Sequence, residues 1–451
     1  MREFWKTGVA VLVLAGLGAY IWFVERKREP GEDGDKKEAI LTLDKEKARE
    51  ITIAASEEET IRLVKDGESW RVAAPFEAPA DSSTVDSMLT SLERLEAEEV
   101  VVEAAENLEQ YGLATPKRTV SVVVEGEAEP RTVEFGAASP GDSAVYARSP
   151  SSARVVTVAT WVESSFDKKP FDLRDRDLLH VKRDDVRTVE VAGPEASYTL
   201  TRTDEGEWAF TKPVATRAGR WAVDGLLGTL ENLRMERVAE EQAEDLGRFG
   251  LGRPSRSVHL VLKDGTTRTL EIGSAAGAAD DGKYHAREKS SPLVAVIPGT
   301  VVNDLEKGMD ELRAKRLLEV ATYDTEGFDV RTGGSSKTFV KSTVKDDDGF
   351  DKTQWRRTAP EEAEVETTTV EDALFKLGGV EAVEFLDSPK APAAYGLDAP
   401  VLEVTVRAKA ETSVAIGKEG EEYFARRSGD EAVLKLDPAK AKEIVEAFAE
   451  L

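Results

Sequence analysis

The chain has 451 residues, with 61 Lys and Arg against 87 Asp and Glu, a formal net charge of −26 and no Cys. A surface this acidic repels phosphate backbones and anionic lipid head groups, so the composition argues against nucleic-acid binding. The absence of Cys excludes disulfides, thiolate catalysis and thiolate metal sites. At roughly 150 residues per domain, the length predicts three domains.

The first predicted element is an uncharged apolar segment, Thr7–Val24, whose 18 residues are near the lower limit for a helix that crosses a bilayer. Aromatic residues lie at both of its ends, and no small-residue cleavage site follows it, which favours an uncleaved anchor over a signal peptide. We therefore predict a transmembrane helix within residues 1–28, inserted in the cytoplasmic membrane, and a charged flexible tether over residues 29–38. Basic residues on both sides leave the orientation open.

The rest of the chain repeats one pattern three times, which predicts three related domains. Each copy has a Trp-x4-Pro motif, an apolar series with helical spacing, a Tyr/Phe-Gly-Leu motif and a Gly that closes an apolar strand. The Trp-x4-Pro motifs are Trp70 with Pro75, Trp208 with Pro213 and Trp355 with Pro360, and the strand glycines are Gly136, Gly273 and Gly417. The first two Trp are 138 residues apart and the last two 147, an excess that fits an insertion around Lys345–Asp351.

Each repeat is predicted to be an α+β domain of antiparallel strands with one long helix packed on a face. Hairpin signals and alternating apolar residues predict the strands, and apolar residues at helical spacing predict a buried stripe on the helix. The predicted domains cover residues 39–180, 181–320 and 321–451. Two matching Leu-Arg…Leu-Leu segments, Leu173–Leu179 and Leu312–Leu318, join them without a Gly/Ser linker, so we expect closely coupled neighbours.

Taken together, the anchor, the tether, the Trp-x4-Pro strand end, the Tyr-Gly-Leu motif and the Tyr146–Arg148 motif resemble the bacterial family of domain of unknown function 4340. The resemblance covers essentially the whole chain. It implies an accessory component of ABC-type transport systems of the gliding-motility kind, with its domains outside the cytoplasmic membrane. The family has no established catalytic residues, so the resemblance transfers none. The third repeat lacks the Leu-Arg tail, which leaves its C-terminal packing open.

The recurring polar residues are three Arg that follow a Tyr by two or three positions. An Arg in this setting needs a carboxylate, an aromatic face or a ligand, and a structural ion pair or cation–π contact is the main expectation. Glu134 and Glu271 are the expected partners, and Ala415 stands in their place in the third repeat. The pairs are Tyr146 with Arg148, Tyr284 with Arg287 and Tyr423 with Arg426.

Motifs for catalysis, cofactors or metals are weak. His180, His259 and His285 lack partners at ligand spacing. Ser165-x-x-Lys168 occurs without the companion motifs of penicillin-recognising enzymes. Gly250-x-Gly252 lacks the third Gly of a dinucleotide loop.

The sequence thus predicts a membrane-tethered structural or interaction protein without a cofactor or a catalytic site. The resemblance implies that its soluble domains lie in the periplasm and that ABC transporter subunits are its partners. Two alternatives stay open. An envelope module that captures a ligand would show a cleft with converging polar groups. A hydrolase based on paired carboxylates needs no sequence motif.

Overall fold

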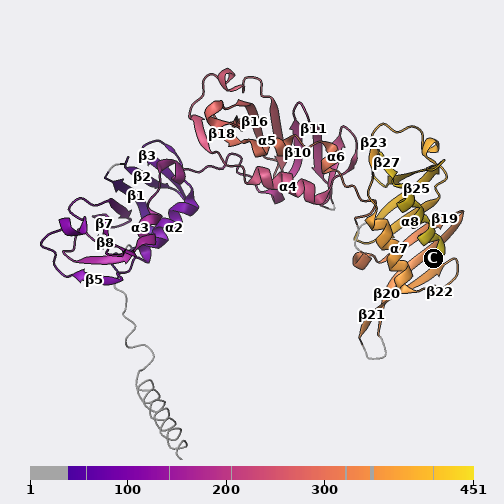
Figure 1. Cartoon of the computed structure of the whole chain (residues 1–451), viewed down its shortest axis with the longest axis horizontal. Helices are drawn as coiled ribbons and strands as arrows, with labels where there is room; N and C mark the ends of the chain where they lie inside the picture. Colours follow the sequence, from indigo (N-terminus) through magenta and orange to yellow (C-terminus); the bar gives the residue numbers. More distant parts are fainter. Residues whose placement is uncertain are drawn as a thin grey trace, which may run out of the picture. The chain divides into compact units, whose positions relative to one another are not determined.

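The computed structural model describes residues 39–451 except 57, 142, 205, 320–321, 346–349 and 410. The chain divides into two compact units, Met1–Asp175 and Arg176–Leu451. The first unit contains one β-sheet and the second contains two (Figure 1). The boundaries proposed at 180/181 and 320/321 stay predictions.

Over the residues that the structure describes, the protein is mainly β, with three nine-stranded antiparallel sheets and few helices. The predicted α+β class with one long helix per repeat is therefore wrong. Strands of two to four residues, such as β4 (Ala78–Pro79) and β5 (Glu99–Val102), close the edges of each sheet. Strands this short have too few residues to show the alternation from which a strand is predicted.

The predicted anchor, Thr7–Val24, lies outside the described residues. Within the described part of the chain, no helix is long and apolar enough to cross a membrane. The longest helices there, α7 (Thr367–Gly379) and α8 (Pro438–Glu450), have 13 residues, whereas a membrane span needs about 20. The structure therefore does not support the predicted transmembrane helix, the single-pass location or the periplasmic placement.

The first sheet has the strand order β4-β3-β2-β1-β6-β7-β8-β9-β5. Its other strands are β1 (Ala48–Ala55), β2 (Ile61–Asp66), β3 (Ser69–Ala74), β6 (Arg118–Val124), β7 (Arg131–Ala138), β8 (Ala144–Arg148) and β9 (Val155–Ala159). Its helical elements are η1 (Lys45–Lys47), α2 (Ser82–Glu93), η2 (Glu109–Tyr111), α3 (Thr160–Ser165) and η3 (Pro170–Leu173).

Helix α2 begins where Asp81 caps it. The Asp81 carboxylate accepts the backbone N–H groups of Ser83 and Thr84 at 3.0 and 3.1 Å, which satisfies two of the donors that a helix start leaves unpaired. The predicted apolar stripe is the buried face of the helix, and it packs on the sheet. Its buried residues are Val85, Met88, Leu89 and Leu92.

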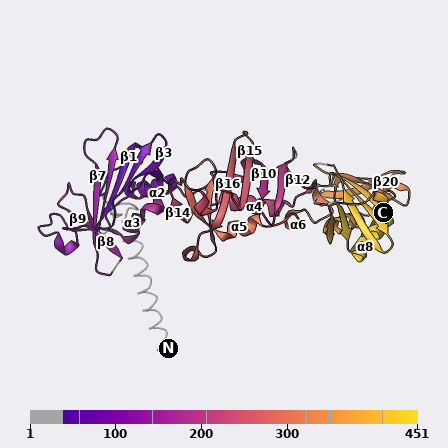
Figure 2. The same cartoon turned by 90° about the horizontal axis from the view of Figure 1, so that it is seen from above.

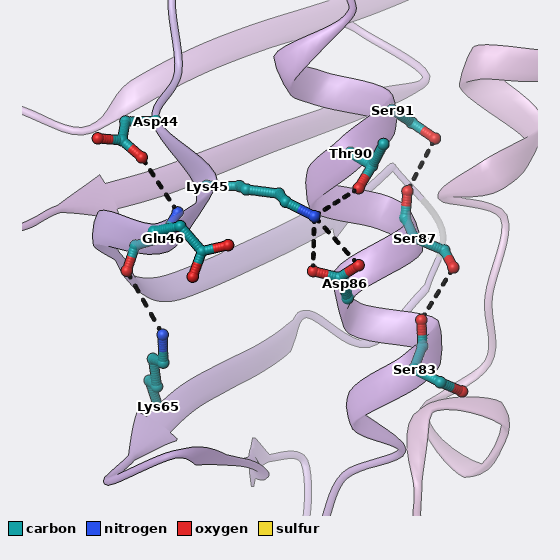
Figure 3. Close-up of polar contacts among 9 residues, drawn as sticks. All are labelled: Asp44, Lys45, Glu46, Lys65, Ser83, Asp86, Ser87, Thr90 and Ser91. Carbon is teal, nitrogen blue, oxygen red and sulfur yellow. Dashed lines mark hydrogen bonds and ion pairs between the residues drawn. The ribbon is translucent and has the colours of Figure 1, made fainter.

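The outer side of α2 is hydrophilic (Figure 3). The Lys45 ammonium, from η1, donates to the Asp86 carboxylate at 3.0 Å and to the Thr90 hydroxyl at 3.2 Å. Farther along the helix, the Ser87 hydroxyl donates to the Ser83 carbonyl at 2.9 Å. These contacts place polar groups on the outer face of α2, and the Lys45 contacts hold η1 against the helix.

The second sheet repeats the first in the order β13-β12-β11-β10-β15-β16-β17-β18-β14. Its strands are β10 (Val186–Ala192), β11 (Ser197–Arg202), β12 (Trp208–Lys212), β13 (Thr216–Arg217), β14 (Arg237–Glu240), β15 (Arg256–Leu262), β16 (Thr267–Ala275), β17 (Lys283–Glu288) and β18 (Val294–Pro298). Its helical elements are η4 (Arg183–Asp185), α4 (Arg220–Glu231), η5 (Gly247–Phe249), η6 (Ala278–Asp280), α5 (Gly299–Leu305) and α6 (Met309–Leu312).

The third sheet has the same order again, β22-β21-β20-β19-β24-β25-β26-β27-β23. Its strands are β19 (Gly327–Thr332), β20 (Ser335–Lys345), β21 (Asp351–Ala359), β22 (Ala363–Glu364), β23 (Glu384–Leu386), β24 (Leu402–Arg407), β25 (Glu411–Glu419), β26 (Glu422–Arg427) and β27 (Val433–Leu436). Besides α7 and α8 it has η7 (Thr322–Asp324) and η8 (Pro392–Tyr395).

The extra residues of the third repeat lengthen the β20–β21 hairpin. Four strand pairs lie beyond Lys341↔Trp355, out to Lys345↔Asp351. In the first repeat only one pair lies beyond the matching Lys65↔Trp70. The insertion that the sequence places around Lys345–Asp351 therefore extends a hairpin and leaves the core unchanged.

The recurring Trp belong to the cores, with exposed fractions of 6% for Trp70, 4% for Trp208 and 0% for Trp355. Trp355 packs edge-on against Phe328, with ring centroids 5.6 Å apart. The recurring Pro residues, Pro75, Pro213 and Pro360, each follow a cis peptide bond.

The strand glycines recur because the Tyr/Phe-Gly-Leu turn passes directly over them. A Cβ on Gly136, Gly273 or Gly417 would overlap a backbone carbonyl oxygen of that turn. These oxygens belong to Tyr111, Phe249 and Tyr395, respectively. The close approach of two backbones, rather than an unusual backbone torsion, therefore explains this Gly.

We expect Trp355→Ala to lower the free energy of unfolding of the third repeat by about 3–5 kcal/mol, because it leaves a cavity in a fully buried site. Urea denaturation followed by circular dichroism would measure the loss. The control is Trp161→Ala, since Trp161 is 64% exposed and its removal should change stability by less than about 0.5 kcal/mol. Equal effects of the two substitutions would contradict the assignment of the recurring Trp to the core.

Within the second repeat, Gly273→Ala should destabilise by about 1–3 kcal/mol, because the added methyl group forces two backbones apart. Gly228→Ala should instead stabilise by about 0.5–1 kcal/mol, because Gly228 is inside helix α4 and a Cβ there meets no atom within 4 Å. Thermal unfolding of both variants tests the opposite signs. A stabilising Gly273→Ala would refute the close-approach explanation.

Candidate functional site

The three recurring Arg occupy one position of the sheet. Strand register places Arg148 opposite Glu134, Arg287 opposite Glu271 and Arg426 opposite Ala415. In the first two repeats the Arg Nε donates to the facing carboxylate, at 2.7 Å for Arg148 and 2.8 Å for Arg287. Arg426 is exposed. Two of the three candidates are therefore engaged in ion pairs inside their own sheets.

The aromatic residue that belongs with each Arg stands two positions before it. It contacts the Tyr or Phe of the Tyr/Phe-Gly-Leu motif, with ring centroids 5.0–5.1 Å apart. The contacts join Tyr146 to Tyr111, His285 to Phe249 and Phe424 to Tyr395. Tyr284 and Tyr423, which the sequence motif pairs with the Arg, each precede the contacting aromatic residue by one position. The position is constant, but its residue changes from Tyr to His and Phe, so a motif that requires Tyr selects the wrong neighbour.

A second polar cluster lies within Arg176–Leu451, where the third sheet meets the end of the second repeat. Arg427 and Asp430 are buried, with side chains 1% and 0% exposed. The Arg427 Nε donates to Asp430 Oδ2 at 2.6 Å. The Arg427 Nη1 donates to the backbone carbonyls of Ala314 and Arg316, at 2.7 and 2.8 Å. We call Arg217, Arg427 and Asp430 the joint cluster.

Arg217, in edge strand β13 of the second sheet, completes the joint cluster. Its backbone N–H donates to Asp430 Oδ1 at 3.0 Å, and its Nη2 donates to the Ser428 carbonyl at 3.0 Å. Burial lowers the pKa of Arg217, an effect that Asp430 opposes and Arg427 reinforces. One carboxylate, Asp430, thus binds the second sheet and the third.

Arg313 is another buried cation of this joint. Its Nη2 donates to Asp387 Oδ2 at 2.7 Å, and its Nη1 lies 3.2 Å from Asp310 Oδ1. The guanidinium also lies 4.7 Å from the ring centroid of Phe385. Asp387 and Phe385 follow α7 in the third repeat, so Arg313 connects the same two parts as the joint cluster.

Sequence reasoning missed Arg427 because it followed residues shared by the repeats. The positions after Arg148 and Arg287 hold Ser149 and Glu288, so a buried Arg exists there in the third repeat alone. The signal that could have found it is an Arg with an Asp three residues later, Arg427 and Asp430, in one copy only.

The weaker sequence candidates remain apart. The His180 N–H donates to Asp177 Oδ1 at 2.9 Å, the His259 ring bonds the Thr269 hydroxyl at 2.9 Å, and the Ser165 hydroxyl donates to the Val162 carbonyl at 2.6 Å. Across the described residues, no three His, Asp or Glu side chains are grouped to hold a metal ion.

The comparison with curated proteins finds human (Homo sapiens) exocyst complex component 4, which is 28% identical over 156 residues, or 33% of this chain. The chain spans 15% of the length of that protein. Two solved structures from Pseudomonas aeruginosa, a DNA polymerase sliding clamp with ligand and a DNA polymerase III subunit beta, are 6% and 7% identical. The alignments cover 88% of this chain and 94% of each structure, with TM-scores of 0.16 and 0.15.

The family model described as "Domain of unknown function (DUF4340)" matches three stretches of the chain, residues 70–218, 208–400 and 355–451. Each match begins at one of the recurring Trp residues. Together the matches span most of the sequence, and the chain therefore belongs to the DUF4340 family.

Proposed function

We propose that this chain, a tandem of three DUF4340 domains, is a structural accessory subunit that binds components of an ABC-type transport complex and has no catalytic activity of its own. The joint cluster is the observation that carries the proposal. It connects the second sheet, the joint segment and the third sheet through buried charges. A subunit of this kind offers partners two domain surfaces in one defined arrangement.

Buried ion pairs favour this interpretation on energetic grounds. Removing two charges from water costs several kcal/mol per ion, and a well-packed apolar pair of similar volume is often as stable. The pair Arg427–Asp430 therefore adds little net stability. Its contribution is to orientation, because the Arg427 guanidinium can reach both carbonyls of the joint segment only when the two repeats are correctly placed. Such a pair selects one arrangement of two domains over other arrangements.

The choice of partner rests on the family resemblance, which implies a place beside ABC-type transport systems. The charge of the chain adds a constraint. With a net charge of −26, the chain attracts basic surfaces and repels acidic ones. We therefore expect its binding surface on a transport complex to be basic.

Arg427→Met should destabilise the second and third repeats together by about 3–5 kcal/mol, because it leaves Asp430 buried without a counter-charge. The double variant Arg427→Met/Asp430→Leu should recover only the part of that loss that comes from the unpaired charge, because backbone groups of Ala314, Arg316 and Arg217 also lose a partner. Arg426→Met, at the exposed neighbouring position, is the matched control and should have little effect.

Denaturant unfolding measures these free energies. Spin-label distances between one Cys introduced in each of the two repeats measure the coupling, since the native chain has no Cys. Arg427→Met should broaden the distance distribution. An unchanged distribution, together with unchanged stability, would mean that the joint cluster does not couple the repeats.

The functional proposal is tested by purifying the tagged full chain from its own cells and identifying the bound proteins. We expect the ATPase and permease subunits of an ABC transporter in near-stoichiometric amounts, retained with Arg426→Met and reduced with Arg427→Met. A stable partner set without ABC subunits would refute the transport assignment. ABC subunits retained equally by both variants would keep the assignment and refute the role of the joint cluster.

A further inference from the structure

Helix α4 has an outer face unlike those of its counterparts α2 and α7. Trp221 lies on it with 83% of its surface exposed, and a Cβ on Gly225 or Gly228 would meet no atom within 4 Å. The matching residues are Ser83, Ser87 and Thr90 in α2, and Thr368, Asp372 and Phe375 in α7. The fold thus accepts side chains at both glycine positions, where each Gly costs about 0.5–1 kcal/mol relative to Ala. The fold of the repeat does not require glycine at these two positions, so it does not explain the two Gly on the outer face of α4.

A cavity of about 390 Å³ opens at the other end of the same helix. It lies between the C-terminal end of α4 and helix α5, which are on the same side of the second sheet (Figure 2). Its lining includes the apolar groups of Met235, Pro298 and Val301 beside the polar Asn232 and Thr229. A site of this volume and composition accommodates an aromatic side chain with one polar atom, such as Trp.

The exposed Trp and the cavity are placed symmetrically about the two glycines. At 1.5 Å per residue, Trp221 is about 8 Å from the midpoint between Gly225 and Gly228, and Asn232 is about 8 Å from it on the other side. A second copy of α4, packed antiparallel across that midpoint, puts Gly225 against Gly228 of the partner copy. The same packing puts Trp221 against Asn232 of the partner copy, at the cavity.

We propose that this face of α4 is the interface of a homodimer, in which Trp221 of each copy fills the cavity of the other. Trp221 and the cavity that accepts it lie on one surface, as expected for an isologous interface, in which the same patch of each copy contacts the other. A different protein would need to match only one of the two features. The glycines allow the two helices to approach closely, as small residues do at helix crossings.

The charges near this face agree with antiparallel packing. The Arg220 guanidinium lies 5.8 Å from the Trp221 ring centroid and would accompany it to the partner's cavity. Asp304 and Glu236 line that cavity, and Asp304 accepts a hydrogen bond from Thr229 at 2.6 Å. Two Arg that also line the cavity, Arg176 and Arg234, are already engaged in other interactions. Asp304 and Glu236 are paired in the same way, with Lys307 and Lys283, each at 2.7 Å. The two acidic and two basic groups of the lining therefore balance, and Arg220 meets no net repulsion there.

One helix face and one side chain make a small interface, so association should be concentration-dependent. Sedimentation velocity of the full chain should show a monomer–dimer transition. Gly225→Ser/Gly228→Thr, which installs the residues of α2, should abolish the dimer while leaving the thermal midpoint of the chain unchanged or higher. Trp221→Ser should also abolish it. Trp161→Ser, at another exposed Trp, is the control and should leave the dimer intact.

Cross-linking tests the register, because the native chain has no Cys to interfere. In the proposed packing the two copies of Asp224 lie on the same edge of the interface, so a short bis-maleimide should link Asp224→Cys chains into a dimer. The matching Asp86→Cys variant in α2 should give none. A chain that stays monomeric at every concentration overturns the proposal. So does a dimer that survives Trp221→Ser, or a cavity that takes up a small molecule in a monomer.

Discussion

The arrangement of Arg176–Leu451 depends on a short segment of backbone that is hydrogen-bonded on both sides. In the joint Leu312–Leu318, the Leu312 carbonyl accepts the N–H of Gly219 from the second repeat at 2.7 Å. A few residues later, the Leu317 N–H donates to the Val380 carbonyl of the third repeat at 3.0 Å. Buried backbone groups have to be paired, so neither repeat can detach from this segment without exposing or orphaning them.

The buried Arg of the joint follow from the same constraint. A segment that gives some of its carbonyls to two sheets still has others to satisfy, and the Arg427 guanidinium meets those of Ala314 and Arg316. Asp430 then balances the charge that this places in the interior. The joint cluster is thus a consequence of passing one extended segment, which makes isolated β-bridges to both repeats, between the second repeat and the third.

Much of the fold was predictable because it rests on local rules that every copy must obey. Trp70 and its equivalents fill cores, Gly136 and its equivalents lie under a turn, and the apolar stripe of α2 covers the sheet. Each of these structural requirements involves a few residues close in sequence, so the same residue types recur in all three repeats. The mainly β class was missed because edge strands such as β4 have two residues and are defined by their partners.

The site was less predictable, because it depends on register and on contacts between repeats. The sequence motif pairs Tyr284 with Arg287, whereas in the structure His285 occupies the position that Tyr146 has in the first repeat. The contacting ring stands two positions before the Arg in every repeat, but it is His285 in the second and Phe424 in the third, so a motif that requires Tyr misses it. Arg427 is missed by a method that follows shared residues, since the matching positions of the other repeats hold Ser149 and Glu288.

The same reasoning indicates where function resides in a tandem of related domains. Residues common to all copies serve folding, and they include two of the three recurring Arg, which are engaged in ion pairs within their sheets. The copies differ on the outer faces of their helices. In α2 the Lys45–Asp86 contact covers that face, whereas α4 exposes Trp221 and α7 exposes Phe375. Residues on these outer faces do not contribute to the core, so they can differ between the copies and bind different surfaces. A protein built this way gains binding specificity by diverging outside a fold that it keeps unchanged.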